Sequence, residues 1–225
     1  MLLDIFSRLY RQKFPEPLAK TSSKVLVSSA SSPAQLRESS ASNASATKPQ
    51  KAKTEVIDFD QAFDRLIDHE GGYSEDPRDP GNWTGGRVNV GELKGTKFGI
   101  ASHSYPYLDI KNLTLQDAKA IYRRDFWDIL NDAHPAIKFQ LFDAAVNHGH
   151  PNAIRFLQNA VNVAPDGDWG KISQGALNAM DHNDVLLRFV AYRLKFWAML
   201  NTFDVHGRGW TRRGADNLLF AAQDN

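Results

Sequence analysis

Residues 15 to about 55 constrain this chain most, because they can contribute little to a packed core. The segment is rich in Ser, Ala, Lys and Pro and shows no sustained periodicity. Such a composition buries too little apolar surface to offset the entropy that the chain loses on folding, which predicts a linker. The rest of the chain, from Asp58 onward, is long enough for one medium domain.

Charge and cysteine content exclude several classes of function. The chain has 27 basic and 26 acidic residues, but residues 1–57 hold 9 basic and 4 acidic ones, so the remainder is slightly acidic. That balance argues against a body that binds nucleic acid. The absence of cysteine excludes disulfides, thiolate metal sites and a cysteine nucleophile. No apolar run is long enough for a transmembrane span.

Residues 1–14 show the spacing of a short amphipathic helix, with Leu2, Ile5, Phe6, Leu9 and Tyr10 on one side. Charged residues at positions 4, 8 and 11 interrupt the apolar run, so we do not expect a signal peptide. This segment is either a docking peptide for a larger assembly, tethered by the linker, or a frayed terminus with chance periodicity.

The body is predicted to be α+β and mostly α. Asp58 or Asp60 suits the N-cap of a first helix that ends near Glu70. Residues 73–100 are rich in Gly, Pro, Asn and Asp, which predicts a loop and a small β-hairpin around 87–90 and 96–100. Helices are expected after that at 114–130, 135–148 and 151–161. A short helix should end near residue 180, a long helix should run from a cap at Asp184 to about residue 203, and a last helix should span 210–222.

Glu70 occupies an unexpected position in the first helix. Phe63, Leu66 and Ile67 lie seven, four and three positions before it, so all four side chains share one helical face. Burial of a carboxylate at a position that faces the core is energetically costly unless the group has a partner or a function. The glycines that follow suit a helix end, where the dipole and partial burial both raise the pKa of a carboxyl group, as a general acid requires. The alternative is a surface Glu that falls in register by chance.

Asp79 supplies a second carboxylate, nine residues later, in a dense polar loop. One partly buried and one solvated carboxylate are the minimum requirement for glycosidic hydrolysis, in which one protonates the leaving oxygen and the other activates water or stabilises positive charge. Asp–Pro loops are also common for purely structural reasons.

Several stretches of this sequence, in order, resemble the signature of glycoside hydrolase family 108, the lysozyme-like N-acetylmuramidases of phage endolysins and some toxin-release systems. Three of them are Glu70–Tyr73, Asp76–Gly81 and Thr96–Ile100. Others resemble the companion region usually labelled a peptidoglycan-binding domain: Phe142–Gly149, Ala153–Gln158, Ala164–Gly167 and Gly207–Trp210. The resemblance spans about residues 58–222 in order, which makes it specific.

The resemblance implies a lysozyme-like fold with a small β-hairpin and a helical C-terminal bundle. It implies a tail at 1–57, a catalytic part at 58–135 and a peptidoglycan-binding-like part at 136–225 in the same globule. Glu70 takes the position of the catalytic acid, while Asp79 and Thr96 would orient water on the far face of the sugar. An insertion between Gly81 and Thr96 departs from the shortest family pattern and makes Thr84 a competitor for the role of Thr96.

Other residues are candidates for substrate binding. Tyr73 is expected on the wall of the cleft, and Asn147 could bond an N-acetyl group. Trp83 lies in the polar loop and could stack on a sugar ring, whereas Trp127 and Trp210 lie in helical surroundings, where an aromatic is more often part of the core.

His148 and His150 flank a glycine, but no third ligand lies at a zinc-like spacing, so we expect a role at a helix end and no metal. Arg208, Arg212 and Arg213 form a basic cluster, which indicates either a solvated face or a site for the carboxylates of peptidoglycan. No nucleophile elbow surrounds Ser104, so a serine hydrolase is not expected.

The sequence therefore predicts a cofactor-free peptidoglycan hydrolase that cleaves the β-1,4 bond between N-acetylmuramic acid and N-acetylglucosamine. Two alternatives stay open: a lytic transglycosylase, and a non-catalytic wall-binding or structural component of a phage tail. The enzyme is expected to act on the cell wall in the periplasm, after synthesis in a host cytoplasm, as an endolysin or as a lysozyme held in the virion through residues 1–57. Retaining or inverting stereochemistry depends on the Glu70–Asp79 separation.

Overall fold

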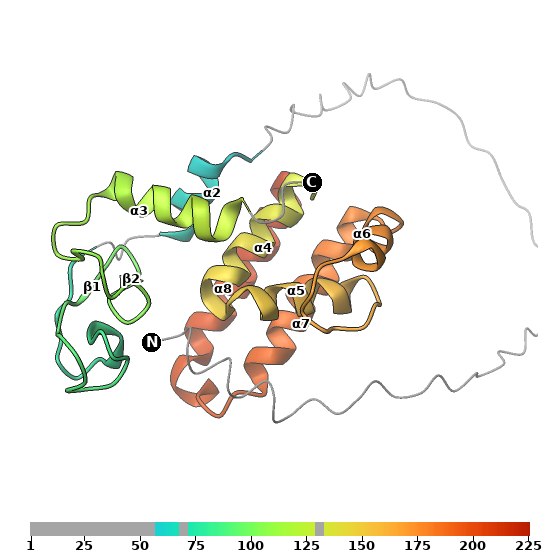
Figure 1. The fold of residues 1–225 in the computed structure, drawn as a ribbon. Coiled ribbons are helices and arrows are strands. Elements are labelled where there is room, and N and C mark those ends of the chain that lie inside the picture. The colour runs from blue at the N-terminus through green and yellow to red at the C-terminus, as the bar shows by residue number, and fades with distance from the viewer. Residues whose placement is uncertain (1–56, 68–71, 129–132) are drawn as a thin grey trace, which may run out of the picture. The chain divides into compact units, whose positions relative to one another are not determined.

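The structure is a computed structural model that describes residues 57–67, 72–128 and 133–225 (Figure 1). The predicted segment 1–14, the linker and Glu70 lie outside the described residues. Helices dominate, and the only β-sheet among the described residues is a two-stranded one. The fold is α+β and mostly α, as predicted.

The first described helix, α2 (Phe59–Leu66), begins where the sequence predicts. Asp58 is its N-cap: the carboxylate accepts from the backbone N–H of Gln61 at 2.9 Å, while the Gln61 side chain accepts from the N–H of Asp58 at 3.2 Å. The helix ends at Leu66 rather than near residue 70, with Ile67 as the C-cap. Its buried face, Phe59, Ala62 and Phe63, shows the spacing of an amphipathic helix.

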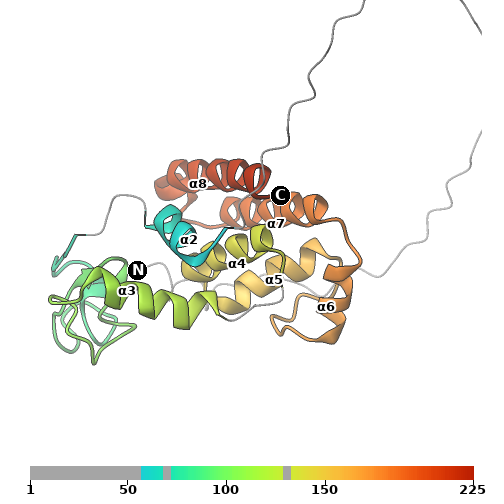
Figure 2. The same cartoon turned by 90° about the horizontal axis from the view of Figure 1, so that it is seen from above.

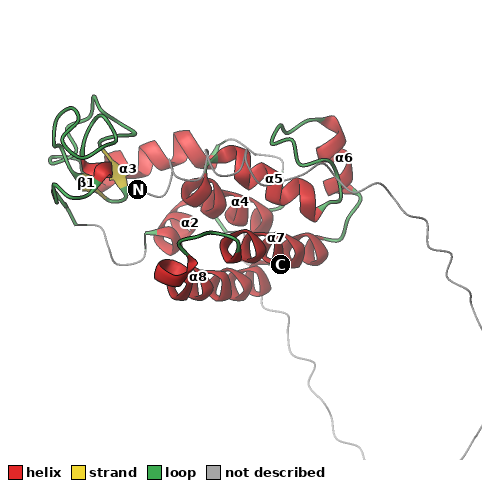
Figure 3. Ribbon diagram, turned by 90° about the horizontal axis from the view of Figure 1, so that it is seen from below, coloured by secondary structure: helices red, strands yellow, loops and turns green. Residues whose placement is uncertain are grey.

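Residues 72–113, which we call the loop-rich lobe, contain little regular structure (Figure 3). A 3₁₀ turn, η1 (Pro80–Asn82), precedes an antiparallel hairpin of β1 (Thr96–Lys97) and β2 (Ile100–Ala101). The hairpin is confirmed, but both strands come from the single stretch 96–101. The strand expected at 87–90 is wrong, because these residues form turns and are exposed.

Helix α3 (Leu115–Tyr122) begins at a capping box on Thr114 and continues into one wider helical turn, η2 (Arg123–Trp127). The helix buries Ala118, Ile121 and Tyr122, whereas Leu115 at its first position is 47% exposed. The wider turn changes which side chains face the core after Tyr122, and Trp127 is buried.

The remaining helices are α4 (Pro135–His148), α5 (His150–Ala160), α6 (Lys171–Asn178), α7 (His182–Ala198) and α8 (Phe203–Asp224). Helix α4 has the predicted bounds: Pro135 opens it and Gly149, at φ +76°, closes it. Two expectations are wrong. Asp181, not Asp184, caps α7 by accepting from the N–H of Asn183, and α8 is one continuous helix that starts at residue 203 rather than 210.

Two groups of buried side chains form the core. One lies among α4, α5, α7 and α8 and includes Phe156, Phe189, Trp197 and Trp210. The other joins α2, α3 and α4 through aromatic contacts of Phe59, Phe63, Tyr122, Trp127 and Phe142. Figure 2 shows α4 flanked by α2, α5 and α7, which explains why α4 contributes to both groups. None of the described helices has the length and apolar character that a membrane crossing requires.

Candidate active site

Asp79 is fixed at the start of the 3₁₀ turn. One of its carboxylate oxygens, Oδ1, accepts from the N–H of Gly81 at 2.8 Å. Pro80 at the first position of the turn restricts the backbone, so the sequence Asp-Pro-Gly determines where the carboxylate lies. The second oxygen accepts from no described residue and is free to accept from water or substrate.

Asn82 connects Asp79 to Thr96. The Thr96 hydroxyl donates to Asn82 Oδ1 at 2.7 Å, and the backbone N–H of Asn82 donates to the carbonyl of Asp79 at 3.1 Å. The Asn82 amide nitrogen donates to the carbonyl of Asp76 at 3.0 Å, and Asn82 is fully buried. Since the Thr96 proton is used in this bond, the Thr96 oxygen is left to accept a proton from water.

Thr96 and Tyr73 are positioned together by backbone pairing. Ser74 and Thr96 exchange two backbone hydrogen bonds, at 2.9 and 2.8 Å, which places the segment after Gly72 beside β1. Tyr73 is half-buried and its hydroxyl donates to the carbonyl of Lys94 at 3.2 Å. Burial, followed by the neighbouring Glu75 charge, raises the pKa of Tyr73, so this residue stays a neutral hydrogen-bonding group.

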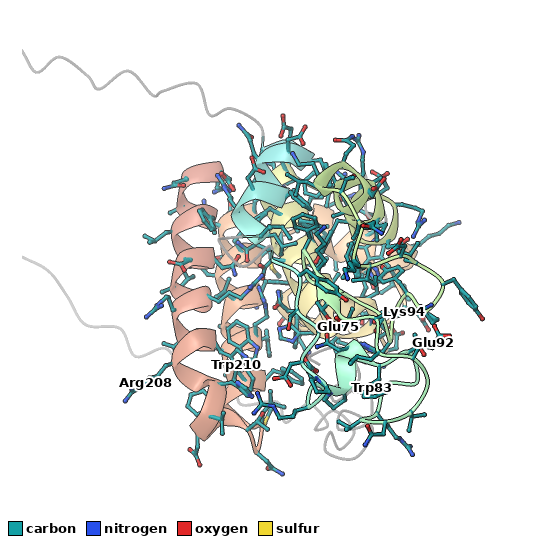
Figure 4. All side chains as sticks on the ribbon, turned by 90° about the vertical axis from the view of Figure 1, so that its left-hand side faces the viewer. Glu75, Trp83, Glu92, Lys94, Arg208 and Trp210 are labelled. Atoms are coloured by element: carbon teal, nitrogen blue, oxygen red, sulfur yellow. The ribbon has the colours of Figure 1, made fainter. Side chains whose placement is uncertain are left out.

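Trp83 follows Asn82 directly and is half-buried, with its indole N–H donating to the carbonyl of Pro77 at 2.9 Å. Figure 4 shows Trp83 and Glu75 on the loop-rich lobe, while Trp210 lies on α8. Trp127 and Trp210 are 7% and 9% exposed, so both belong to the core, as expected.

The insertion closes on itself. Trp83 pairs with Leu93, and the N–H of Thr84 donates to the carbonyl of Glu92 at 2.9 Å. The Thr84 hydroxyl accepts from the N–H of Glu92, also at 2.9 Å. Thr84 is therefore occupied within the insertion, whereas Thr96 is bonded to the turn that carries Asp79.

The two other predicted site residues are not part of this lobe. Asn147 is half-buried on α4, and its amide nitrogen donates to the carbonyl of Asp143 one turn earlier at 2.7 Å. Glu70 lies outside the described residues. The structure thus brings together Asp79, Thr96, Tyr73 and Trp83.

The helical body contains a buried charged cluster that we did not predict from the sequence. Asp143 on α4 contacts Arg193 of α7 at 2.7 Å and Arg213 of α8 at 2.6 Å. Burial disfavours the ionised carboxylate, but the Arg213 and Arg193 charges outweigh it and hold the pKa of Asp143 well below its ordinary value. The expectation of a solvated Arg213 is therefore wrong.

The lobe and the helices are joined by hydrogen bonds at α3 and η2. The Tyr122 hydroxyl donates to the carbonyl of Phe98 in the β1–β2 turn at 3.0 Å. The Tyr105 hydroxyl donates to Asp125 at 2.8 Å. Burial raises the pKa of Tyr122 to about 12, so its hydroxyl remains a donor to Phe98 throughout the neutral range.

His148 and His150 do not lie in a metal site of the described residues, where no group of three potential ligands gathers. His150 contacts the carbonyl of Asp125 at 2.7 Å and stacks on Phe126. His148 is buried against Phe156 and Trp197. Both histidines have roles at the junction of α4 and α5, as the sequence predicts.

Asn82 and the Asp143 cluster are the residues that sequence reasoning missed. Asn82 could have been found as the polar residue that ends the Asp-Pro-Gly-Asn turn. Asp143 had a visible signal too, since it is a charged residue inside the apolar run of α4, where an unpaired charge would be costly.

The comparisons with known proteins concern the domain that holds this candidate site. Residues 63–149 match the family model described as Glycosyl hydrolase 108, a range that holds every predicted site residue. Among solved structures, the chain is similar to that of SagA from Brucella abortus, with a TM-score of 0.61 and 28% identity over 74% of this chain and 95% of that one. No curated protein matches the sequence. Residues 63–149 therefore match a glycosyl hydrolase 108 domain, the fold is lysozyme-like, and the match supports a glycoside hydrolase of the lysozyme type with peptidoglycan as its substrate.

Proposed function

We propose that the enzyme is an N-acetylmuramidase that cleaves the β-1,4 bond between N-acetylmuramic acid and N-acetylglucosamine. The observation that carries this proposal is the link from Asp79 through buried Asn82 to Thr96, inside the matched glycoside hydrolase domain. We infer that the free Asp79 carboxylate oxygen and the Thr96 hydroxyl oxygen both accept from one water molecule.

In this mechanism Glu70 protonates the leaving glycosidic oxygen. Asp79 stabilises the oxocarbenium-like charge or takes a proton from water, which Thr96 helps to orient. Thr96 is assigned this role rather than Thr84, because the Thr84 hydroxyl is bonded within the insertion. Tyr73, Trp83 and Asn147 are proposed to contact the substrate.

The test is Glu70→Gln, which keeps the size of the side chain and removes the acid. We expect release of muropeptides from purified wall to fall by roughly 10²–10⁴-fold, the usual contribution of a general acid. The circular dichroism spectrum and the melting temperature should match the wild type. Full activity in this variant would contradict the assignment of the acid.

The products distinguish the alternatives. Mass spectrometry should find reducing N-acetylmuramic acid ends, since Asp79 and Thr96 are proposed to activate water. Anhydro-muramyl ends would instead identify a lytic transglycosylase. Binding to insoluble wall without release of fragments by the wild type would identify a non-catalytic wall-binding protein.

We further propose that residues 1–57 hold the enzyme in a phage particle until it reaches the wall. Deletion of residues 1–55 should preserve activity on purified wall and abolish incorporation into virions. Co-purification of the truncated protein with particles would contradict this role.

A further inference from the structure

The buried charged cluster has more positive than negative charge. Arg193 and Asp143 have side chains that are 1% and 4% exposed, and Arg213 adds a second guanidinium to the same carboxylate. Burial, followed by the nearby Arg193 charge, lowers the pKa of His148 well below its ordinary value, so His148 is neutral. The buried groups therefore carry a net charge of one positive unit, which is costly in a low-dielectric interior.

Only Arg213 can share that charge with a ligand. Its side chain is 32% exposed, whereas Arg193 is closed off from solvent. Its Nε and Nη2 atoms donate to Asp143 at 3.0 and 2.6 Å, while Nη1 donates to no other described residue. The carboxylate thus fixes the plane of the guanidinium and leaves one donor nitrogen available.

Arg213 lies on the side of α8 that faces α4, because its guanidinium contacts Asp143. It is close enough to Tyr122 for its charge to lower the pKa of the hydroxyl, against the larger effect of burial. Tyr122 in turn donates to Phe98, two residues after Thr96. Asn147 lies one helical turn after Asp143 on α4. Arg213 therefore contacts α4 one helical turn before the proposed site residue Asn147.

The surroundings of Arg213 provide one other anion, the Asp216 carboxylate on the same helix, which is exposed to solvent. Figure 4 shows Arg208, which belongs to the same basic cluster, on the outer side of α8. Arg208 and Arg212 are exposed, and no described carboxylate holds either of them. A preorganised guanidinium with a free donor distinguishes Arg213 from these two.

We propose that Arg213 is a substrate-binding residue that pairs with a carboxylate of the wall polymer, held in place by Asp143. The inference rests on the proposed function, because the wall polymer carries carboxylates on its stem peptides, and on its lactyl groups wherever a stem peptide has been removed. A bound carboxylate neutralises the excess charge of the cluster, which makes anionic substrate preferable to neutral substrate.

The test combines a change in the enzyme with a change in the substrate. Arg213→Gln is compared with wild type on native wall and on wall whose carboxylates have been converted to amides. Arg213→Gln leaves Arg193 and Asp143 as a neutral buried pair, so the variant should fold. Arg212→Gln, one residue away and exposed, is the matched control.

We expect the wild type to lose about tenfold in kcat/KM on the amidated wall, the factor expected for one charge-assisted hydrogen bond. Arg213→Gln should lose the same factor on native wall, mainly through KM, and lose nothing further on amidated wall. Arg213→Lys, which keeps the charge, should recover part of the discrimination. A wall stripped of stem peptides, which exposes the lactyl carboxylate, tells which of the two carboxylates is bound.

Equal cleavage of native and amidated wall by the wild type would overturn the inference without any variant. The inference would also be overturned if Arg213→Gln lost activity by the same factor on native and on amidated wall, because a purely structural role reduces activity on both substrates alike. If the wild type releases no fragments from any wall, the proposed function fails instead.

Discussion

Asp143→Asn tests the physical account of the charged cluster. The substitution keeps the shape of the side chain and removes the negative charge that Arg193 and Arg213 share. Two guanidinium groups would then face each other around a neutral amide, with Arg193 unable to reach solvent. Removal of one partner of a buried ion pair costs about 3–5 kcal/mol, and we expect a loss of that size.

Arg213→Gln is the comparison that makes the prediction specific. It removes one of two positive charges and leaves the contact between Arg193 and Asp143, so we expect a smaller loss of about 1–2 kcal/mol. Urea unfolding at neutral pH, followed by circular dichroism, measures both losses. Equal destabilisation by the two variants would refute the reasoning, since the stability of the cluster would then not depend on whether a negative or a positive charge is removed.

The same cluster predicts a pH dependence. Burial opposes ionisation of Asp143, but the two guanidinium groups dominate and lower its pKa in the folded protein. An aspartate in the unfolded chain titrates near pH ~3.9. The stabilisation is therefore fully present above about pH 5 and decreases as the pH falls towards the folded pKa. Between about pH 5 and 3 the wild type should lose more unfolding free energy than Asp143→Asn; parallel curves would contradict this account.

Two further predictions concern the loop-rich lobe. Thr96→Ala should lower kcat by roughly 10²-fold through loss of the oxygen that orients water, while Thr84→Ala should leave the rate unchanged and cost about 1 kcal/mol of stability; equal rates would reject the assignment. Gly99→Ala should destabilise the protein by roughly 1–3 kcal/mol, because Gly99 has φ +75° and an added Cβ would lie 2.5 Å from the Tyr122 hydroxyl. An unchanged melting temperature would show that the turn can relax.

Local signals in the sequence predicted the helices well where they were strong. Asp58 and its partner Gln61 start α2, and Pro135 and Gly149 bound α4. The prediction was wrong where local patterns compete: Asp181 and Asp184 both suit a cap, and the structure uses the first. The wider turn η2 was not predicted because its cause is tertiary, namely the burial of Trp127.

The sequence indicated residue types for the candidate site, but it did not indicate how those residues are connected. Asp79 and Thr96 were chosen from the sequence, but their link depends on Asn82, whose bond to Thr96 spans fourteen residues. Arg213 looked like a surface residue because its partner Asp143 lies seventy positions earlier. Such a pair forms because α4, α7 and α8 pack together, and local sequence patterns do not predict this packing.

The self-closed insertion has a consequence for protein engineering. The hydrogen bonds between Thr84 and Glu92 and the pairing of Trp83 with Leu93 close the excursion at its base. Nothing in the link from Asp79 to Thr96 passes through the tip of the loop, at 86–90. This tip is therefore a grafting position at which a recognition peptide for a chosen bacterial surface can be inserted while the hydrogen bonds that join Asp79, Asn82 and Thr96 are kept.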